Sequence, residues 1–525
     1  MFKNKRILLI CKETYSYPLY YLAKDWGDNN VVASYFFNPA ECMFNKSILN
    51  ENTYYKHIEL NNLKVFDSKE IVQIFTKNIK NPKVDMDYIN HIEEKYTHFK
   101  NINLQLLSTQ KMSTYYHDRI YYSNSTNNQQ LYWIELNYKR ALEIIDTFRP
   151  DVIIDTDSSE LARTVINEIA YSKGIPYITI EYPRYELYKI PAYDLGNCID
   201  KNFELVYKEK LRKPDESLLN ECNYVNQFRK KNNIMSSEYT NDVTSKYEID
   251  GIYTSLKTIF GMVLYFWNQD ITAKNLRIKI KNNILFAPSI RYILFYVIWE
   301  IRKRYLFGKS ALFSDPNKDD KYVYMPLHLI PESSTLTKSP FYINELMVIE
   351  QVSKSLPAGW VLYVKEHQSM IGQRSLKFYK KVNSLHNAKM VTLNFHKDPK
   401  PWIENAKGVI TITGTSAYEA ALLGKRSIVF GEVSYNLIEG ISRIHSFEEL
   451  PSLIASFGPI DNIKSCAAYI AAVKSVGTKI NLKYLMAEGE AILKGDKILS
   501  DEYQKQIDQL SEFYEKAYVK YKETI

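Results

Sequence analysis

The chain has few cysteines and no long apolar run, and these absences exclude several classes of protein. Its 525 residues contain five cysteines, which are scattered and include no Cys-x-x-Cys pair. A disulfide framework and a zinc site are therefore not supported, and a reducing cytoplasm fits this composition. The first apolar run, residues 7–10, is too short for the core of a secretory signal and is typical of a strand.

Acidic residues are almost missing from one segment, and this segment carries the excess charge. The net charge is +8, and residues 271–310 contain nine Lys or Arg against a single acid, Glu300. Apolar, aromatic-rich runs at residues 259–267 and 292–299 lie within or beside it, each far shorter than the roughly 20 residues that cross a bilayer. Such a segment suits a helix on an anionic membrane surface, and it suits equally a pair of core helices with a basic outer face. No nucleic-acid recognition module accompanies it, so we expect no nucleic-acid partner.

Strand and helix patterns alternate at both ends of the chain. Four strand candidates occupy residues 6–11, 31–37, 151–155 and 176–182, and five more occupy residues 322–329, 360–367, 388–394, 407–414 and 426–431. Helical patterns separate most of them, which predicts two parallel sheets of the α/β class. We expect an N-terminal domain (residues 1–200), a basic aromatic helical insert (201–320), a second domain (321–458) and C-terminal helices (459–525).

Charged and hydroxyl side chains follow three strands of the second half. They are His328 and Glu332, then Lys365, Glu366 and His367, then Thr413, Gly414, Thr415 and Ser416. Ligands of open parallel sheets bind beyond the carboxyl ends of the strands, so these groups predict a site. Gly414 lets the chain bend into a helix whose free N–H groups attract phosphate, and Glu419 can reach a ribose hydroxyl. Plain helix capping by Thr415 or Ser416 gives the same pattern.

Three blocks in this order resemble the C-terminal half of the capsule polysaccharide biosynthesis family. They are PLHLIPESSTL at residues 326–336, LPAGWVLYVKEHQSMIGQRS at 356–375 and ITITGTSAYEAALLGKRSIVFG at 410–431. The first half echoes the family at residues 151–181 and at His117-Asp118-Arg119. Ile330 stands where the family has Gln, and Gln368 stands where it has Pro. Members include Kdo-type transferases that use CMP-activated sugars.

The resemblance implies a GT-B architecture, with two Rossmann-type domains facing a cleft and C-terminal helices packing back across it. The donor side would comprise His328, Glu332, Lys365, Gly414, Thr415, Ser416 and Glu419. The catalytic groups would be Asp155, Asp157, Glu366 and His367, and the acceptor side would comprise Arg119, Glu160 and Glu181.

Each catalytic assignment has a structural alternative. A carboxylate such as Asp155 or Asp157 would act as general base or as nucleophile in glycosyl transfer. Alternatively, residues 157–160 only cap a helix and complement its dipole. His367 would hydrogen-bond or protonate the departing phosphate, or it would only brace its loop. We expect no metal cofactor, because the second half contains no Asp-x-Asp and the helix N-terminus with Lys365 can neutralise the phosphates.

The leading hypothesis is a cytoplasmic glycosyltransferase of capsule or lipopolysaccharide biosynthesis that transfers a sugar from a nucleotide donor. The family resemblance implies that this sugar is of Kdo type and is linked to CMP. Its partners would be a nucleotide sugar, a glycan or lipid-linked acceptor and, through residues 259–310, the anionic inner face of the membrane. The alternatives are a nucleotide-sugar 2-epimerase-like enzyme and a non-catalytic capsule assembly or export factor. The donor, the acceptor and the stereochemical outcome stay open at this stage.

Overall fold

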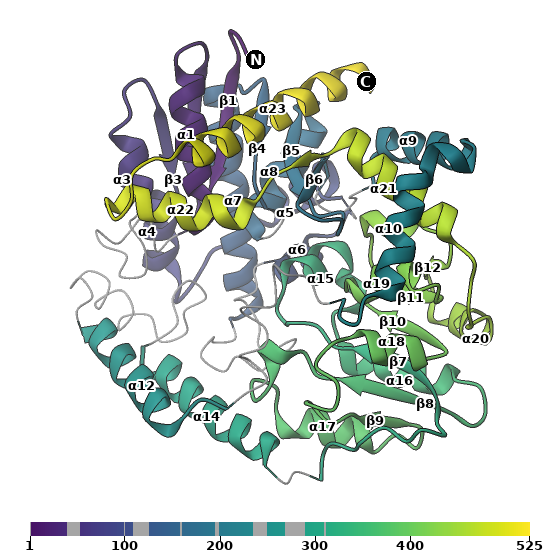
Figure 1. Cartoon of the computed structure of the whole chain (residues 1–525). Helices are drawn as coiled ribbons and strands as arrows, with labels where there is room; N and C mark the ends of the chain where they lie inside the picture. The colour runs from purple at the N-terminus through teal and green to yellow at the C-terminus, as the bar shows by residue number, and fades with distance from the viewer. Residues whose placement is uncertain are drawn as a thin grey trace.

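The computed structural model describes residues 2–38, 53–98, 100–108, 125–157, 160–194, 199–234, 249–267, 289–308 and 311–524. Arg119 with its neighbours His117 and Asp118, and much of the basic segment, lie outside these residues. The described chain forms two halves, each built on its own sheet (Figure 1).

The first half contains a seven-stranded sheet in the order β13-β6-β5-β4-β1-β2-β3. The strands are β1 (Arg6–Cys11), β2 (Val31–Phe36), β3 (Lys64–Asp67), β4 (Val152–Ile154), β5 (Tyr177–Glu181), β6 (Tyr188–Ala192) and β13 (Thr478–Lys479). β1 to β5 are parallel, and β6 and β13 add two antiparallel edge pairings. β1 is buried on both faces from Ile7 onward, which explains its continuous apolar sequence.

The second half contains a six-stranded parallel sheet in the order β12-β11-β10-β7-β8-β9. The strands are β7 (Lys321–Pro326), β8 (Trp360–Lys365), β9 (Ala388–Met390), β10 (Gly408–Thr411), β11 (Ser427–Val429) and β12 (Ile441–Arg443). The sequence pattern predicted the first five of these strands. It missed β12, and also the short β3, β6 and β13 of the other sheet, because strands of two to five residues carry little periodicity.

Helices cover both sheets. In the first half they are α1 (Ser16–Gly27), α3 (Thr53–Ile58), α4 (Lys69–Asn78), α5 (Met86–Lys95), α6 (Ile102–Ser108), α7 (Asn127–Phe148) and α8 (Leu161–Ser172). The second half has α15 (Ser333–Lys338), α16 (Glu345–Ser355), α17 (Leu376–Asn383), α18 (Lys400–Asn405), α19 (Ser416–Leu422) and α20 (Leu450–Ala455). The predicted fold class, two GT-B-like α/β halves with parallel sheets, is confirmed by this arrangement.

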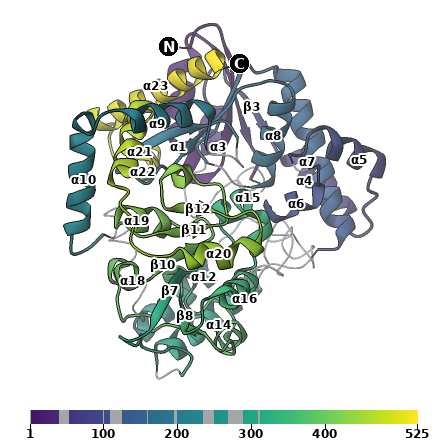
Figure 2. The same ribbon diagram turned by 90° about the vertical axis from the view of Figure 1, so that its right-hand side faces the viewer.

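Five helices connect or bridge the halves. α9 (Lys201–Arg212) and α10 (Leu219–Lys230) pack against α21 (Ile463–Val476), beside the second half (Figure 2). The chain then returns, so that α22 (Leu482–Lys494) and α23 (Asp501–Thr524) lie across the first sheet. The Tyr514 hydroxyl of α23 donates to the carbonyl of Asp155 at 2.7 Å, which ties the end of the chain to the end of β4.

The described parts of the basic segment form two helices on the edge of the second half, α12 (Ile252–Trp267) and α14 (Ser289–Phe307) (Figure 1). They pack on each other, with the Ser255 hydroxyl donating to Glu300 at 2.9 Å. α14 also contacts the loop that follows β8, because the Trp299 indole donates to the carbonyl of Ile371 at 2.7 Å. At Gly372 an added Cβ would lie 2.7 Å from the backbone of α14, so only glycine permits this contact.

Candidate functional site

Three adjacent strands of the second sheet bring the predicted donor-side residues together. β10, β7 and β8 are neighbours in the sheet, and their carboxyl ends lead into the segments that carry Thr413 to Ser416, His328, and Lys365 to His367. Parallel strands end at the same edge, so residues separated by almost ninety positions meet there. The roles assigned to them stay predictions, but their convergence is a property of the fold.

His328 links two of these strand ends. Its backbone N–H donates to Glu345 at 2.6 Å, and Nδ1 lies 3.2 Å from the same carboxylate oxygen. Its Nε2 accepts from the backbone N–H of Thr413 at 3.2 Å, so the proton of a neutral ring belongs on Nδ1, facing Glu345. The imidazole is buried and therefore orients the turn after β10 rather than reaching into solvent.

Lys365 is a buried cation at the end of β8. It is 4% exposed, and Nζ donates to the carbonyl of His396 at 2.7 Å and lies 5.6 Å from the centre of the Trp402 ring. Burial lowers the pKa of Lys365 to about 8, an effect that the nearby Asp398 only partly opposes. An anionic ligand would favour its charged form and raise this pKa.

Glu366 lies within a buried ionic network. Its carboxylate accepts from Arg374 Nε at 3.0 and 3.1 Å and from the Tyr379 hydroxyl at 2.7 Å, and Arg374 also pairs with Glu345 at 2.5 Å. Burial raises the pKa of Glu366, whereas Arg374 and His328 outweigh burial and lower that of Glu345. Direct catalysis by Glu366 would require these hydrogen bonds to open, and its predicted catalytic role stays a prediction.

His367 is the part of this cluster nearest to solvent. It caps the short 3-10 turn at Gln368–Met370, where Nδ1 accepts from the backbone N–H of Ser369 at 3.2 Å. Its own backbone N–H donates to Glu366 at 2.7 Å. The ring is partly exposed at the carboxyl edge of the sheet, which is compatible with both the loop-bracing and the functional interpretation.

The turn from β10 into α19 carries hydroxyl groups without partners. Among the described residues, Thr413 Oγ1 and Ser416 Oγ are both buried and make no hydrogen bond within the protein. Gly414 lies between them, and a Cβ there would come within 2.4 Å of Thr411 Oγ1 and 3.3 Å of His328 Nε2. Buried hydroxyls without partners are costly, so their position marks a place for a polar ligand.

Glu419 faces two charged residues that the sequence did not indicate. Burial and the like charge of Asp398 raise its pKa to about 7, while Arg184 and a hydrogen bond from Thr415 act in the opposite direction. Arg184 follows β5 in the first half and has a left-handed backbone conformation, φ +65°. Glu419 is therefore only partly ionised near neutral pH and lies close to both halves.

Glu332 and Glu181 bound the site on either side of the cleft. Glu332 is the N-cap residue of α15, and its carbonyl accepts from the Thr335 hydroxyl at 2.9 Å. Glu181, at the end of β5, pairs with Lys338 of α15 at 2.6 Å, and both side chains are about nine-tenths buried. This ion pair joins the first half to the second, so Glu181 holds the cleft together.

The carboxylates of the first half are also bound to cations. Asp155 is fully buried and accepts from Arg163 Nε at 2.8 Å and from the Tyr177 hydroxyl at 2.5 Å. Asp157 is partly exposed and lies 3.2 Å from Arg163 Nη1. Asp155 therefore holds Arg163 in place, and of these two residues Asp157 is the one that a substrate can approach.

Glu160 begins α8 with φ +89° and pairs with Lys12 at 2.5 Å, at the end of β1. Although burial lowers the pKa of Lys12, the charges of Glu160 and Glu13 raise it above its usual value. Arg119 lies outside the described residues, so its predicted place on the acceptor side is a proposal. No group of three potential metal ligands occurs in the part of the chain that the structure describes.

The sequence missed Glu345, Arg374, Asp398 and Arg184. Arg374 lies within the block that resembles the capsule family, seven residues after His367, and this was an available signal. The other three come from a helix and two loops with no distinctive local pattern. Only the tertiary arrangement brings them to the site.

The fold and site define a two-half α/β protein with a candidate anion site at the edge of its second sheet. No protein-family model and no curated protein matches this chain. Among solved structures, the beta Kdo 2,7 transferase KpsC of Thermosulfurimonas dismutans is 12% identical, with 68% of this chain and 90% of that chain covered and a TM-score of 0.31.

UDP-GlcNAc 2-epimerases are matched as well. The Methanocaldococcus jannaschii enzyme is 11% identical over 89% of this chain and 98% of its own, with a TM-score of 0.24. The Neisseria meningitidis enzyme bound to UDP-GlcNAc is 10% identical over the same shares, with the same TM-score. These TM-scores are too low to favour either activity, so the choice between them rests on the site itself.

Arg374 provides a test of the buried network. We expect Arg374→Met to lower the free energy of unfolding by about 3–5 kcal/mol, because two buried carboxylates lose their cation. Lys354→Met removes a lysine from the exposed pair with Glu350 and should change stability by less than about 0.5 kcal/mol. Urea unfolding followed by tryptophan fluorescence measures both. A loss below about 1 kcal/mol for Arg374→Met would contradict the central role of Arg374.

Proposed function

We propose that this protein is a nucleotide-sugar-dependent glycosyltransferase of surface polysaccharide biosynthesis, acting on a glycan or glycolipid acceptor. The observation that carries the proposal is the turn after β10, where the unpartnered hydroxyls of Thr413 and Ser416 flank Gly414. The donor phosphates would bind at this turn, with Lys365 as a nearby cation. A CMP-linked sugar of Kdo type is the donor that the sequence resemblance suggests.

We assign roles to the remaining groups from their positions and chemistry. Glu419 would accept a hydrogen bond from the ribose, and His367 would hydrogen-bond the departing phosphate as general acid. On the facing half, Asp157 would deprotonate the acceptor hydroxyl, with Arg163 holding its carboxylate in place. These steps need no metal, because the helix N-terminus and Lys365 offset the phosphate charge.

We also propose that α12 and α14 hold the enzyme at the surface of a membrane. Seven exposed apolar residues of α12 fall within an arc of about 120°, at 100° per residue: Ile252, Tyr253, Leu256, Phe260, Val263, Leu264 and Trp267. On α14, Ile290, Leu294, Ile301 and Tyr305 form a similar exposed stripe. Such faces are typical of helices that lie in the lipid interface.

Three of the described cations of this segment are bonded to other groups of the protein or buried. Arg304 donates to the carbonyl of Asp250 at 2.9 Å and pairs with Glu300, and Arg302 donates to the carbonyl of Gln373 at 3.4 Å. Lys303 is 8% exposed. Of the described cations, Lys257 and Arg291 are the exposed ones beside the apolar stripes, so apolar insertion would carry more of the binding than charge. No helix in the described ranges has the length and apolarity that crossing a bilayer requires.

The hydroxyl pair gives the first test. Ser416→Ala and Thr413→Val should each weaken nucleotide binding by about tenfold or more, because a hydrogen bond to a charged phosphate contributes about 1.5–3 kcal/mol. The melting temperature of the free protein should not fall, because neither hydroxyl has a partner to lose. Thermal-shift titration with CMP-, UDP- and GDP-sugars measures both quantities.

Thr411→Val is the matched control for this test. The Thr411 hydroxyl accepts from the backbone N–H of Gly414 at 3.1 Å, so its loss should lower the melting temperature. Unchanged nucleotide affinity in both hydroxyl variants, or no nucleotide binding by the wild type, would overturn the phosphate site.

The pKa of Lys365 predicts how binding depends on pH. Below about pH 8 the lysine is charged in both the free and the bound protein, so Lys365 adds no pH dependence to the affinity there. Above that pH the free protein must take up a proton on binding, and affinity should fall by up to about tenfold per pH unit. Lys365→Met should remove this decline. Glu419→Gln should leave it in place and remove only a separate change in affinity near pH 7, where the Glu419 carboxyl titrates. If affinity still declines above pH 8 in Lys365→Met, a group other than Lys365 causes the decline.

The membrane contact can be tested with vesicles. We expect the wild type to co-sediment with vesicles containing phosphatidylglycerol, and more weakly with pure phosphatidylcholine. Phe260→Asp together with Ile301→Asp should abolish binding, since both side chains are more than 60% exposed and lie within the apolar stripes. Thr254→Asp, an exposed polar position of α12, is the control and should bind as the wild type does. Equal binding by all three proteins would show that this face does not contact lipid.

A further inference from the structure

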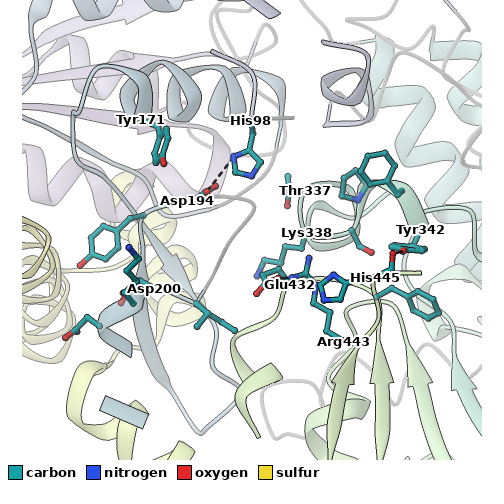
Figure 3. Close-up of a pocket in the computed structure, with 18 of the residues that line it drawn as sticks. His98, Tyr171, Asp194, Asp200, Thr337, Lys338, Tyr342, Glu432, Arg443 and His445 are labelled. Atoms are coloured by element: carbon teal, nitrogen blue, oxygen red, sulfur yellow. Dashed lines mark hydrogen bonds and ion pairs between the residues drawn. The ribbon is translucent and has the colours of Figure 1, made fainter. Parts of the chain in front are cut away.

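A pocket lies between the two halves, separate from the turn after β10 that carries the unpartnered hydroxyls. It has a volume of about 980 Å³ and is lined by the first half, the second half and the end of α23. Figure 3 shows His98, Tyr171 and Asp194 on one side and Glu432, Arg443 and His445 on the other. A pocket of this size is at the upper end of the range for small-molecule sites.

Three cations of the pocket lie beside carboxylates. Arg443 pairs with Glu432, and Lys338 pairs with Glu181. Lys520 lies close enough to Asp200 to lower the pKa of its carboxyl, although burial raises that pKa overall. A phosphate needs cations whose charge is not already offset, so this lining suits a ligand with neutral hydroxyl groups better.

Exposed aromatic rings stand beside these polar groups. Tyr171 is 75% exposed on α8 and Phe341 is 61% exposed after α15, one from each half. The rings of Tyr193 and Tyr521 pack together on the third side of the pocket, with their centres 5.2 Å apart. Rings with an apolar face beside planar hydrogen-bonding groups can contact both the C–H surface and the hydroxyls of a sugar.

One buried hydroxyl in the pocket is unsatisfied within the described chain. Ser339 is 2% exposed, and its Oγ makes no hydrogen bond to any described group. Ser339 follows α15 and lines the pocket. A ligand hydroxyl there would satisfy it without the cost of desolvating a charge.

The pocket adjoins the proposed phosphate site. Gly431 precedes the pocket residue Glu432, and a Cβ at Gly431 would lie 2.4 Å from Thr413 Cγ2 and 3.1 Å from Ser339 Cβ. The Glu432 backbone N–H donates to the carbonyl of Lys338 at 3.1 Å. One wall therefore separates the unpartnered hydroxyls of Thr413 and Ser339, and ligands at the two sites would be neighbours.

We infer that this pocket binds the acceptor glycan, as a chain of hydroxyl-rich sugars stacked on Tyr171 and Phe341 and hydrogen-bonded by Ser339, His445 and the Arg443–Glu432 pair. The inference rests on the proposed glycosyltransferase function. In this inference the acceptor contacts residues of both halves, and its reacting hydroxyl would lie near the acidic residues after β4.

The test uses the full-length protein on an array of bacterial surface oligosaccharides, followed by titration of the strongest binder. Phe341→Ala and Tyr171→Ala should each weaken its binding more than tenfold, and Ser339→Ala about fivefold. Leu219→Ala removes a similarly exposed apolar side chain from α10, outside the pocket, and should bind as the wild type does. All four variants should keep the thermal shift that nucleotide sugars produce.

The two proposals can fail separately. No binding to any oligosaccharide of the array, or equal binding by the pocket variants and Leu219→Ala, would overturn the glycan pocket even if nucleotide sugars bind. Conversely, a missing nucleotide shift would overturn the proposed function. Oligosaccharide binding that depends on Phe341 and Ser339 would then still support a glycan site.

Discussion

Buried arginine–carboxylate networks at the carboxyl ends of the strands are the constraint on which both halves depend. Arg374 holds Glu366 and Glu345 in the second half, and Arg163 holds Asp155 and Asp157 in the first. A tyrosine hydroxyl donates to the innermost carboxylate in each case. Burying these charges is costly unless every partner is present, so the networks fix the strand ends in one arrangement.

From this constraint follows the rigidity of the candidate donor site. Glu345 fixes His328, and His328 in turn accepts from the backbone of Thr413, so the turn after β10 is held from the neighbouring strand. The turn is therefore ordered before any ligand arrives. A preorganised turn needs little rearrangement on binding, which favours both affinity and rate.

The relation between the two halves depends on few but well-buried contacts. The Glu181–Lys338 pair crosses the cleft, and α21 to α23 carry the chain back to the first sheet. Because the pocket that we assign to the glycan takes residues from both halves and from α23, a bound glycan would itself stabilise their relative arrangement. α14, which contacts the loop after β8, would connect this closure to the surface that we assign to lipid.

The sequence by itself determined the fold class and most of the residues at the edge of the second sheet. Apolar runs that end in charged or hydroxyl residues define both the strands and their carboxyl ends, as in the segment from Trp360 to His367. That convergence could be predicted, because parallel strands end at one edge of a sheet.

Only the tertiary structure decided which of these residues are buried and which stay accessible. Asp155 and Glu366 come directly after strands, and Asp157 and His367 follow within two residues, yet the first two are buried against arginines that lie eight residues further along the chain. Glu345, Asp398 and Arg184 come to the site from unrelated segments, and the pocket between the halves is lined by residues from both. Burial and charge pairing are properties of the packed chain, and no local pattern of residues encodes them.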